Sequence, residues 1–191
     1  MSRISLVNIA HNLIRDVLHP GALVIDATVG NGHDTLFLAE QIGPSGWIYG
    51  FDIQQAAIDS TREKFQQAHI PESLTLIHAS HADMDEKIPR QHCGKISVIM
   101  FNLGYLPGGN KRIITQTDST LLALNSASRL LKTEGLITIL AYPGHVDGDQ
   151  ETEQVKNWCE QLNPDQFNVR TIYGTEQKES APRLFVVSKR R

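Results

Sequence analysis

The sequence predicts an α/β fold with a mostly parallel sheet of seven strands, helices on both of its faces, and one antiparallel terminal strand. Three observations support this prediction. Short apolar runs typical of strands alternate with longer segments of helical periodicity, which is the pattern of a parallel sheet. Residues 96–101 are almost entirely apolar, as in a strand buried on both faces. The last two strand-like runs are joined by a short link, which favours an antiparallel pair.

The predicted elements follow from periodicity and from residues that break helices. Apolar residues recur at helical spacing from Leu6 to Val17, and Pro20 with Gly21 stops that helix. We expect this N-terminal region, residues 1–20, to cover the core. Strands are expected at residues 23–27, 46–52, 74–77, 96–101, 135–141, 168–173 and 183–188, and further helices up to residue 42 and at 54–69, 115–131 and 150–162.

Residues 1–191 are interpreted as a single domain, because the length fits one and neither a repeat nor a linker interrupts the chain. No apolar run is long enough to span a bilayer and the N-terminus lacks a signal-peptide core, so we expect no membrane association and a cytoplasmic location. The net charge of −3 argues against bulk electrostatic binding of nucleic acid. The net charge does not exclude binding of nucleic acid by a local basic patch such as Lys111 with Arg112.

Residues 26–34 carry the strongest functional signal. Gly30 and Gly32 connect the strand-like run 22–25 to a helical run that begins at residue 35. Because glycine has no Cβ, the backbone can turn sharply and approach a ligand, and the following helix presents unpaired N–H groups. Asp52 ends the next strand, where a carboxylate can hold both hydroxyls of a ribose. The pattern predicts a cofactor site.

The glycines alone do not identify that cofactor. The nicotinamide fingerprint has a third small residue three positions after the second glycine, where this chain has Thr35. Asp26, beside the turn, would repel a pyrophosphate but suits a ligand with a sulfonium and an ammonium group. S-adenosylmethionine is such a ligand. NAD, and a tight turn that binds no ligand, remain alternatives.

Polar residues follow the other predicted strands at the edge where open α/β sheets bind ligands. Ser80 and His81, after the third strand, are placed to meet an adenine edge, although Ser80 could serve only as a helix cap. Asn102 follows the fourth strand, with Tyr105 soon after it. His145, after the fifth strand, is a candidate general base or a loop residue that only shapes the site.

The D-x-x-x-G-x-G segment at Asp26, with an acid closing the second strand, resembles the motifs of the Rossmann-like class I S-adenosylmethionine-dependent methyltransferases. The segment from Asn102 resembles the [D/N]-P-P-Y motif of methyltransferases that modify amino groups on bases, but Leu103 and Gly104 replace the two prolines. In that chemistry the amide oxygen of Asn102 accepts a hydrogen bond from the target N–H and points the nitrogen lone pair at the sulfonium methyl. Tyr105 would stack on a base or form a wall of the site.

Five segments are more particular than this superfamily: D-A-T-V-G-N-G-H-D-T, G-F-D-I-Q, H-A-S-H, F-N-L-G-Y-L-P-G-G and Y-P-G-H. Together they closely resemble a small bacterial family labelled rRNA methylases. Its members are understood as tRNA wobble-uridine methyltransferases that convert 5-aminomethyl-2-thiouridine to 5-methylaminomethyl-2-thiouridine. The resemblance covers essentially the whole chain. It implies S-adenosylmethionine as cofactor, the anticodon region of tRNA as partner, and a homodimer.

The resemblance and the positions at strand ends together suggest roles for individual residues. Cofactor binding is expected of Asp26, Thr28, Gly30, Asn31, Gly32, Asp34, Thr35, Asp52, Ile53, Gln54, Ser80, His81 and Asn102. Catalytic roles are expected of Asn102, Tyr105 and His145, and substrate contacts of Gly104, Pro107, Lys111 and Arg112. No metal site is expected, because His33, His81 and His145 do not form a pair with ligand spacing on one element.

Two alternatives would keep every cofactor residue. A class I methyltransferase acting on ribosomal RNA or on a small molecule would differ only at the rim of the site. A module that binds the cofactor without catalysis would require that the loop after Asn102 does not reach the methyl group. An orienting amide, an aromatic residue and a basic pair on one loop favour an enzyme over such a module.

Overall fold

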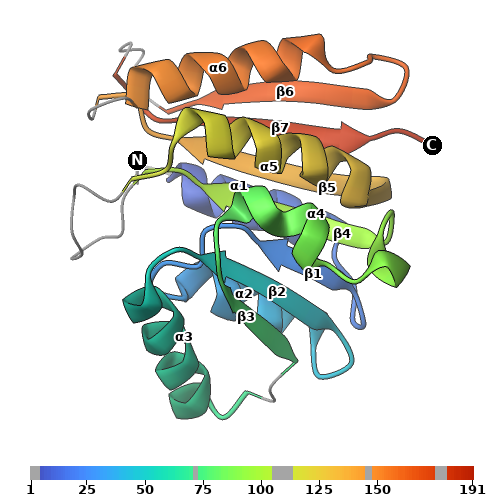
Figure 1. Ribbon diagram of the computed structural model, residues 1–191. Helices are drawn as coiled ribbons and strands as arrows, with labels where there is room; N and C mark the ends of the chain where they lie inside the picture. The colour runs from blue at the N-terminus through green and yellow to red at the C-terminus, as the bar shows by residue number, and fades with distance from the viewer. Residues whose placement is uncertain (1–4, 71–72, 105–113, 145–147, 175–179) are drawn as a thin grey trace.

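The computed structural model describes residues 5–70, 73–104, 114–144, 148–174 and 180–191, in which strands and helices alternate along the chain (Figure 1). The strands are β1 (Leu23–Asp26), β2 (Trp47–Asp52), β3 (Leu74–His78), β4 (Ile96–Asn102), β5 (Leu131–Ala141), β6 (Phe167–Tyr173) and β7 (Arg183–Lys189). The helices are α1 (Leu6–Val17), α2 (His33–Ile42), α3 (Gln55–Ala68), α4 (Met84–Lys87), α5 (Thr117–Leu130) and α6 (Gly148–Gln161), with 3-10 turns η1 (His81–Asp83) and η2 (Arg90–His92).

The seven strands form one sheet in the order β3-β2-β1-β4-β5-β7-β6. Strands β1 to β5 pair in parallel, whereas β7 runs antiparallel to both of its neighbours, β5 and β6. This arrangement confirms the predicted mostly parallel sheet with one antiparallel strand. The strand order reverses between β1 and β4, and an open α/β sheet forms its ligand crevice at such a switch point.

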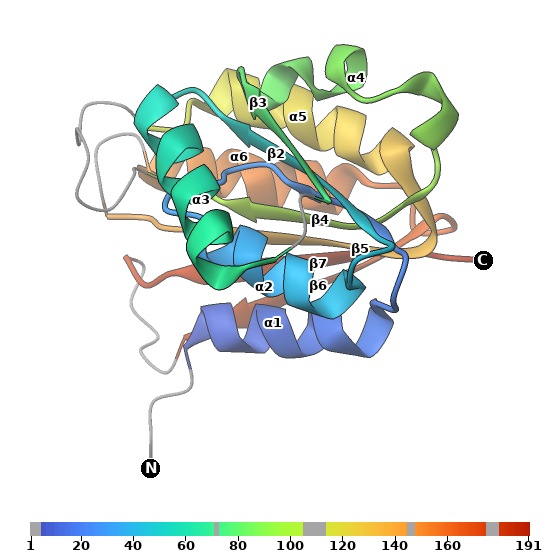
Figure 2. The ribbon, with the colours of Figure 1, turned by 90° about the horizontal axis from the view of Figure 1, so that it is seen from below.

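Helices cover both faces of the sheet (Figure 2). Helices α1, α2 and α3 lie on one face, and α4, α5 and α6 lie on the other. Helix α1 packs against β5 and β7. Among the helices that the structure describes, none combines the length and the apolar character needed to cross a membrane.

The core consists of two apolar layers because successive strand residues point to opposite faces. Ile99 and Phe101 of β4 belong to the layer under α4, α5 and α6. Val98 and Met100 alternate with them along the strand and belong to the layer under α1 and α2. The unbroken apolar run of β4 therefore reflects a strand buried on both sides, as the sequence predicted.

The boundaries differ from the prediction around β5. This strand begins at Leu131, earlier than the predicted residue 135, because Leu131 adopts an extended backbone directly after α5 and pairs with Ile96. The register then shifts before Leu136 pairs with Val98, and Glu134 in this interval has a φ of 62°. The two 3-10 turns and the short helix α4, between residues 81 and 92, have no counterpart in the predicted elements.

Candidate active site

A cavity of about 920 Å³ lies beyond the carboxyl ends of β1 to β5. It collects the residues that directly follow these strands, so the position of the site is the one that the strand-end rule predicts. Of the predicted site residues, Thr28, Gly30, Asn31, Asp34, Asp52, Ile53, Gln54, Ser80, His81, Asn102 and Gly104 line this cavity.

The glycine loop forms the floor of the cavity between β1 and α2. Gly32 has a φ of 74°, and a Cβ at this position would lie 2.5 Å from Oγ1 of Thr61 on α3. Any side chain there would therefore be strained and would push the loop away from α3. Gly30 also has a positive φ, of 54°, and lines the cavity. These two glycines allow the loop to pass close to a ligand.

Asp52, at the end of β2, joins the glycine loop to the next strand end. Its Oδ2 accepts a hydrogen bond from the N–H of Gly30 at 2.9 Å, and its Oδ1 accepts one from the N–H of Gln54 at 2.8 Å. A carboxylate can accept about four hydrogen bonds. Asp52 therefore holds the loop in place and retains acceptor capacity on the cavity side for two further donors, such as the hydroxyls of a ribose.

Asp26, Gly32 and Thr35 are buried and are not among the residues that line the cavity. Asp26 Oδ2 accepts a hydrogen bond from the hydroxyl of Thr35 at 2.6 Å, and its Oδ1 accepts one from the N–H of Thr28 at 3.1 Å. This carboxylate thus shapes the loop from below. Its direct contact with a cofactor stays a prediction.

Burial, followed by the charge of Asp34, raises the pKa of Asp26 from 3.8 to about 7. The folded protein therefore binds this proton more tightly than the unfolded chain does. The contribution of Asp26 to the free energy of unfolding therefore falls as the pH rises from about 4 to about 7. Above pH 7 the carboxyl is ionised in both states, and the loss of stability does not increase further.

We accordingly expect Asp26→Asn to gain stability relative to the wild type as the pH rises from 5 to 8, by roughly 2–3 kcal/mol. Urea unfolding of both proteins at several pH values measures this difference. Burial lowers the pKa of His81, so this residue makes the free energy of unfolding rise with pH in the acid range. Both proteins contain His81, and its contribution therefore cancels when their free energies of unfolding are subtracted. Parallel stability curves for the two proteins would contradict the raised pKa.

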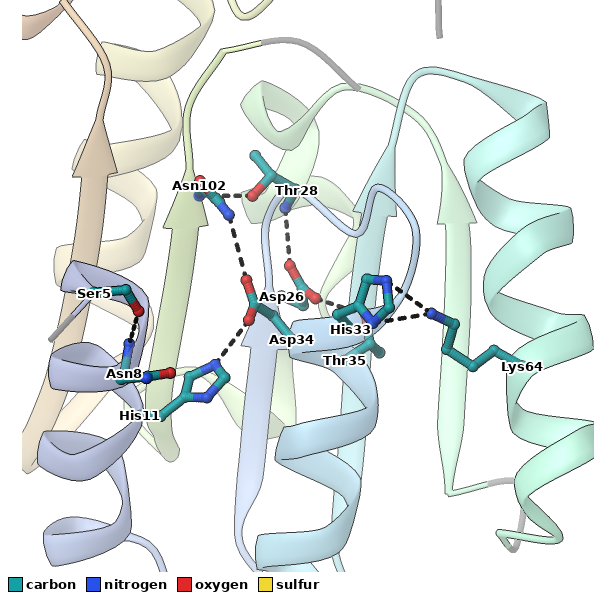
Figure 3. A network of polar contacts seen from close by, with 10 residues as sticks. All are labelled: Ser5, Asn8, His11, Asp26, Thr28, His33, Asp34, Thr35, Lys64 and Asn102. Atoms are coloured by element: carbon teal, nitrogen blue, oxygen red, sulfur yellow. Dashed lines mark hydrogen bonds and ion pairs between the residues drawn. The ribbon is translucent and has the colours of Figure 1, made fainter. Parts of the chain in front are cut away.

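A polar network connects α1, α2 and β4 at the rim of the cavity (Figure 3). Asp34 Oδ1 accepts a hydrogen bond from His11 Nε2 at 2.8 Å, and its Oδ2 accepts a longer one from Asn102 Nδ2 at 3.4 Å. The N–H of Asn102 donates to Thr28 Oγ1 at 2.7 Å. His11 is itself stacked on Phe37, with ring centroids 3.7 Å apart. Asn102 is therefore held at both its backbone and its side chain.

Ser80 and His81 follow β3 on the other side of the cavity. Ser80 Oγ accepts a hydrogen bond from the N–H of Ala82, so it caps η1 and also lines the cavity. His81 is buried, and its Nδ1 donates to the carbonyl oxygen of Ala27 at 3.2 Å. The neutral ring then carries a lone pair on Nε2, which has no hydrogen-bond partner within the described ranges. A ligand donor would satisfy it.

Five predicted residues lie outside the described residues: Tyr105, Pro107, Lys111, Arg112 and His145. Nothing in the structure tests their roles. Within the residues that are described, no group of three or more histidine, cysteine or acidic side chains is arranged to hold a metal ion.

The structure also brings residues to the site that the sequence did not reveal. Thr115, Gln116 and Ser119 line the cavity near the start of α5, and His11 on α1 hydrogen-bonds the cavity residue Asp34. No motif marks these positions, because they come from segments remote from the strand ends. Tyr142 and Pro143 also line the cavity, and their position directly after β5 is a sequence signal that could have identified them.

Comparison with known proteins places this chain in a family. A family model described as "Putative rRNA methylase" matches residues 48–188, which include most of the sheet and the Asn102 segment. This chain belongs to the rRNA methylase family. Its fold is that of the class I S-adenosylmethionine-dependent methyltransferases, which confirms the predicted fold class.

Solved rRNA methylase relatives superpose on nearly the whole chain. An rRNA methylase structure from Clostridium thermocellum has a TM-score of 0.92 and 35% identity, and the match covers 99% of this chain and 100% of that one. A methyltransferase from Streptococcus mutans, solved in complex with SAH, has a TM-score of 0.86 and 31% identity over 98% and 99% of the two chains.

Two curated relatives are longer. The chloroplastic tRNA (mnm(5)s(2)U34)-methyltransferase of Arabidopsis thaliana is 42% identical over 156 residues, which are 78% of this chain and 56% of that protein. The ribosomal RNA small subunit methyltransferase H of Caldicellulosiruptor saccharolyticus is 27% identical over 88 residues, 46% of this chain and 28% of that protein. This rRNA methylase chain thus spans about half or less of the curated relatives that it matches.

Proposed function

We propose that this protein is an S-adenosylmethionine-dependent N-methyltransferase of tRNA. Its substrate would be 5-aminomethyl-(2-thio)uridine at the wobble position and its product 5-methylaminomethyl-(2-thio)uridine. The Arabidopsis relative, whose name specifies mnm(5)s(2)U34, the proposed product nucleoside, supports this reaction with 42% identity. The Streptococcus mutans structure in complex with SAH supports the cofactor.

The observation that carries the proposal is the placement of Asn102. Its side chain lines the cavity at the end of β4, and its amide nitrogen faces the carboxylate of Asp34, which can only accept. The amide oxygen is thereby available as an acceptor for an N–H of the target amine. A hydrogen bond to that oxygen would point the amine lone pair toward the reacting methyl group.

The described residues fit the proposed cofactor. The cavity is large enough for a nucleoside with an amino-acid tail, and Asp52 offers acceptors for two ribose hydroxyls. Asn31 and Asp34 lie where the amino-acid part would bind, and the carboxylate of Asp34 suits an ammonium group. The lone pair of His81 Nε2 would accept a hydrogen bond from a ligand N–H.

S-adenosylmethionine supplies the methyl group when it is bound. Held by Asp52, Asn31 and Asp34, it would offer an electrophilic methyl group to the neutral amine that Asn102 orients, with S-adenosylhomocysteine as the leaving group. An amine that arrives as an ammonium ion must first lose a proton. We propose that His145 accepts this proton and that Tyr105 stacks on the base.

The partner would be the anticodon region of tRNA, contacted by Gly104, Pro107, Lys111 and Arg112. Because the chain has a net charge of −3, we propose that two copies form a homodimer whose combined basic rims bind the RNA. The proposed location is the cytoplasm.

The decisive experiment is nucleoside mass spectrometry of tRNA that carries 5-aminomethyl-2-thiouridine, after incubation with the protein and S-adenosylmethionine. The expected result is a gain of one methyl group on that nucleoside. Transfer RNA that lacks the aminomethyl group is the matched control and should gain none. No gain on the aminomethyl nucleoside, with cofactor binding verified by calorimetry, would refute this substrate.

A second substrate class has its own support. The family description names rRNA, and the relative from Caldicellulosiruptor is named as a ribosomal RNA methyltransferase. A class I enzyme acting on ribosomal RNA, or on a small molecule, would keep the same cofactor residues. Methylation of ribosomal RNA with no change in tRNA would favour this alternative.

A further inference from the structure

The cavity is connected to a buried acid on α6 that does not line it. Glu151 is 2% exposed. Its Oε2 accepts a hydrogen bond from the hydroxyl of Thr115, and its Oε1 accepts one from the hydroxyl of Thr120, each at 2.7 Å. Hydrogen bonds to a carboxylate are short and strong, so this residue fixes the direction of both hydroxyl groups.

Thr115 passes this constraint to the chain that follows Asn102. Its Oγ1 accepts a hydrogen bond from the N–H of Gly104 at 2.9 Å, and its own N–H donates to the carbonyl oxygen of Gly104 at 2.9 Å. A hydroxyl has a single proton. Because Thr115 donates that proton in its hydrogen bond to Glu151, a lone pair of Oγ1 is directed to accept the hydrogen bond from the N–H of Gly104. The two reciprocal bonds clasp residue 104 to residue 115.

This clasp accounts for the missing prolines of the [D/N]-P-P-Y pattern. The N–H of Leu103 donates to the carbonyl oxygen of Leu140 at 2.8 Å, and the N–H of Gly104 donates to Thr115. Proline has no N–H and could make neither bond. Gly104 also has a φ of 134°, which the proline ring forbids. Hydrogen bonds here provide the stiffness that two rings would otherwise give.

We propose that Glu151 is a positioning residue that aligns the acceptor side of the active site through Thr115 and Gly104. The proposal rests on the N-methyl transfer proposed above. Gly104 is two residues from Asn102 and lines the cavity, so the direction in which the chain leaves β4 sets where the Asn102 amide meets the target amine. Among the described residues, the hydrogen bonds of this network do not include Asp52, Gln54 or His81.

The test compares two threonines that bond the same carboxylate. Thr115→Val removes the side-chain hydrogen bonds to Glu151 and to the N–H of Gly104 and keeps the backbone bond to the Gly104 carbonyl. Thr120→Val removes a bond to Glu151 that leads to no cavity residue. Since a displacement of about 1 Å can lower the rate about 100-fold, we expect Thr115→Val and Glu151→Gln to lower kcat/KM for the RNA about tenfold or more. Thr115→Ser, which retains the hydroxyl, should restore it. Thr120→Val should match the wild type in kcat/KM, and all variants should keep the wild-type Kd for S-adenosylmethionine.

A second measurement does not depend on catalysis. Amide hydrogen exchange of Gly104, followed by NMR of protein labelled with 15N-glycine, should accelerate in Thr115→Val and Glu151→Gln but not in Thr115→Ser. Unchanged exchange, or unchanged kcat/KM in both variants, would overturn the positioning role. If the wild type methylates no RNA at all, the proposed function fails, and the exchange of Gly104 alone still decides whether Glu151 holds this backbone.

Discussion

Replacement of Asn102 by alanine is expected to lower the rate of methyl transfer by about 10²–10³-fold while cofactor affinity stays close to that of the wild type. The variant loses the amide oxygen that would orient the target amine. It keeps the backbone N–H that donates to Thr28, so the end of β4 should hold its position. Single-turnover methyl transfer measures the rate, and calorimetry with S-adenosylmethionine measures the affinity.

A control for this variant is Asn168→Ala, which removes an exposed asparagine from β6 and should leave both quantities unchanged. The division of roles would be wrong if Asn102→Ala weakened cofactor binding as much as it slowed transfer. That outcome would mean that the hydrogen bond to Asp34 supports the cofactor and that the amide does not orient the acceptor.

Replacement of Asp52 by alanine should produce the largest loss of cofactor affinity, an increase in Kd of about 100-fold or more. Two effects add. The proposed ribose loses its acceptor, and the N–H groups of Gly30 and Gln54 lose the carboxylate that holds them. Each tenfold change in affinity corresponds to about 1.4 kcal/mol, and unpaired N–H groups cost about 1–3 kcal/mol each. Equilibrium binding of S-adenosylmethionine measures the change.

Asp59→Ala is the matched control, because Asp59 is a half-exposed carboxylate on α3 whose ion pair with Arg62 is exposed. We expect it to bind the cofactor as the wild type does. The Kd of Asp52→Asn should lie between those of the wild type and Asp52→Ala, since the amide keeps one acceptor oxygen. Wild-type affinity in Asp52→Ala would show that the ribose is held elsewhere, and thermal unfolding of each variant separates lost affinity from lost folding.

The fold was predictable because its signals are local. Alternating periodicity places the strands, and the apolar run of β4 identifies a strand buried on both faces. The early start of β5 was not predictable, because it depends on the pairing of Leu131 with Ile96, a contact between segments far apart in the sequence. A helical pattern and a strand pattern overlap at that leucine, and only the sheet decides between them.

The same distinction applies to the site. The glycine loop and Asp52 lie within one strand–helix–strand unit, so their spacing could be recognised from the sequence alone. The contribution of His11 depends on where α1 docks, and that of Glu151 depends on how α6 faces α5. The burial of Asp26 and its hydrogen bond from Thr35 also depend on how the loop folds over β1, and its predicted role in cofactor binding stays a prediction.

The packing of α1 against β7 has a consequence for the order in which the protein matures on the ribosome. Leu6 and Ile14 share an apolar layer with Leu184 and Val186, so the first helix completes the burial of its apolar face only after the last strand has been synthesised and inserted between β5 and β6. His11 reaches Asp34 only when that helix has docked. The packing of the first helix, and with it the support of the contact between His11 and Asp34, is therefore complete only after residue 186 has been translated, long after the glycine loop.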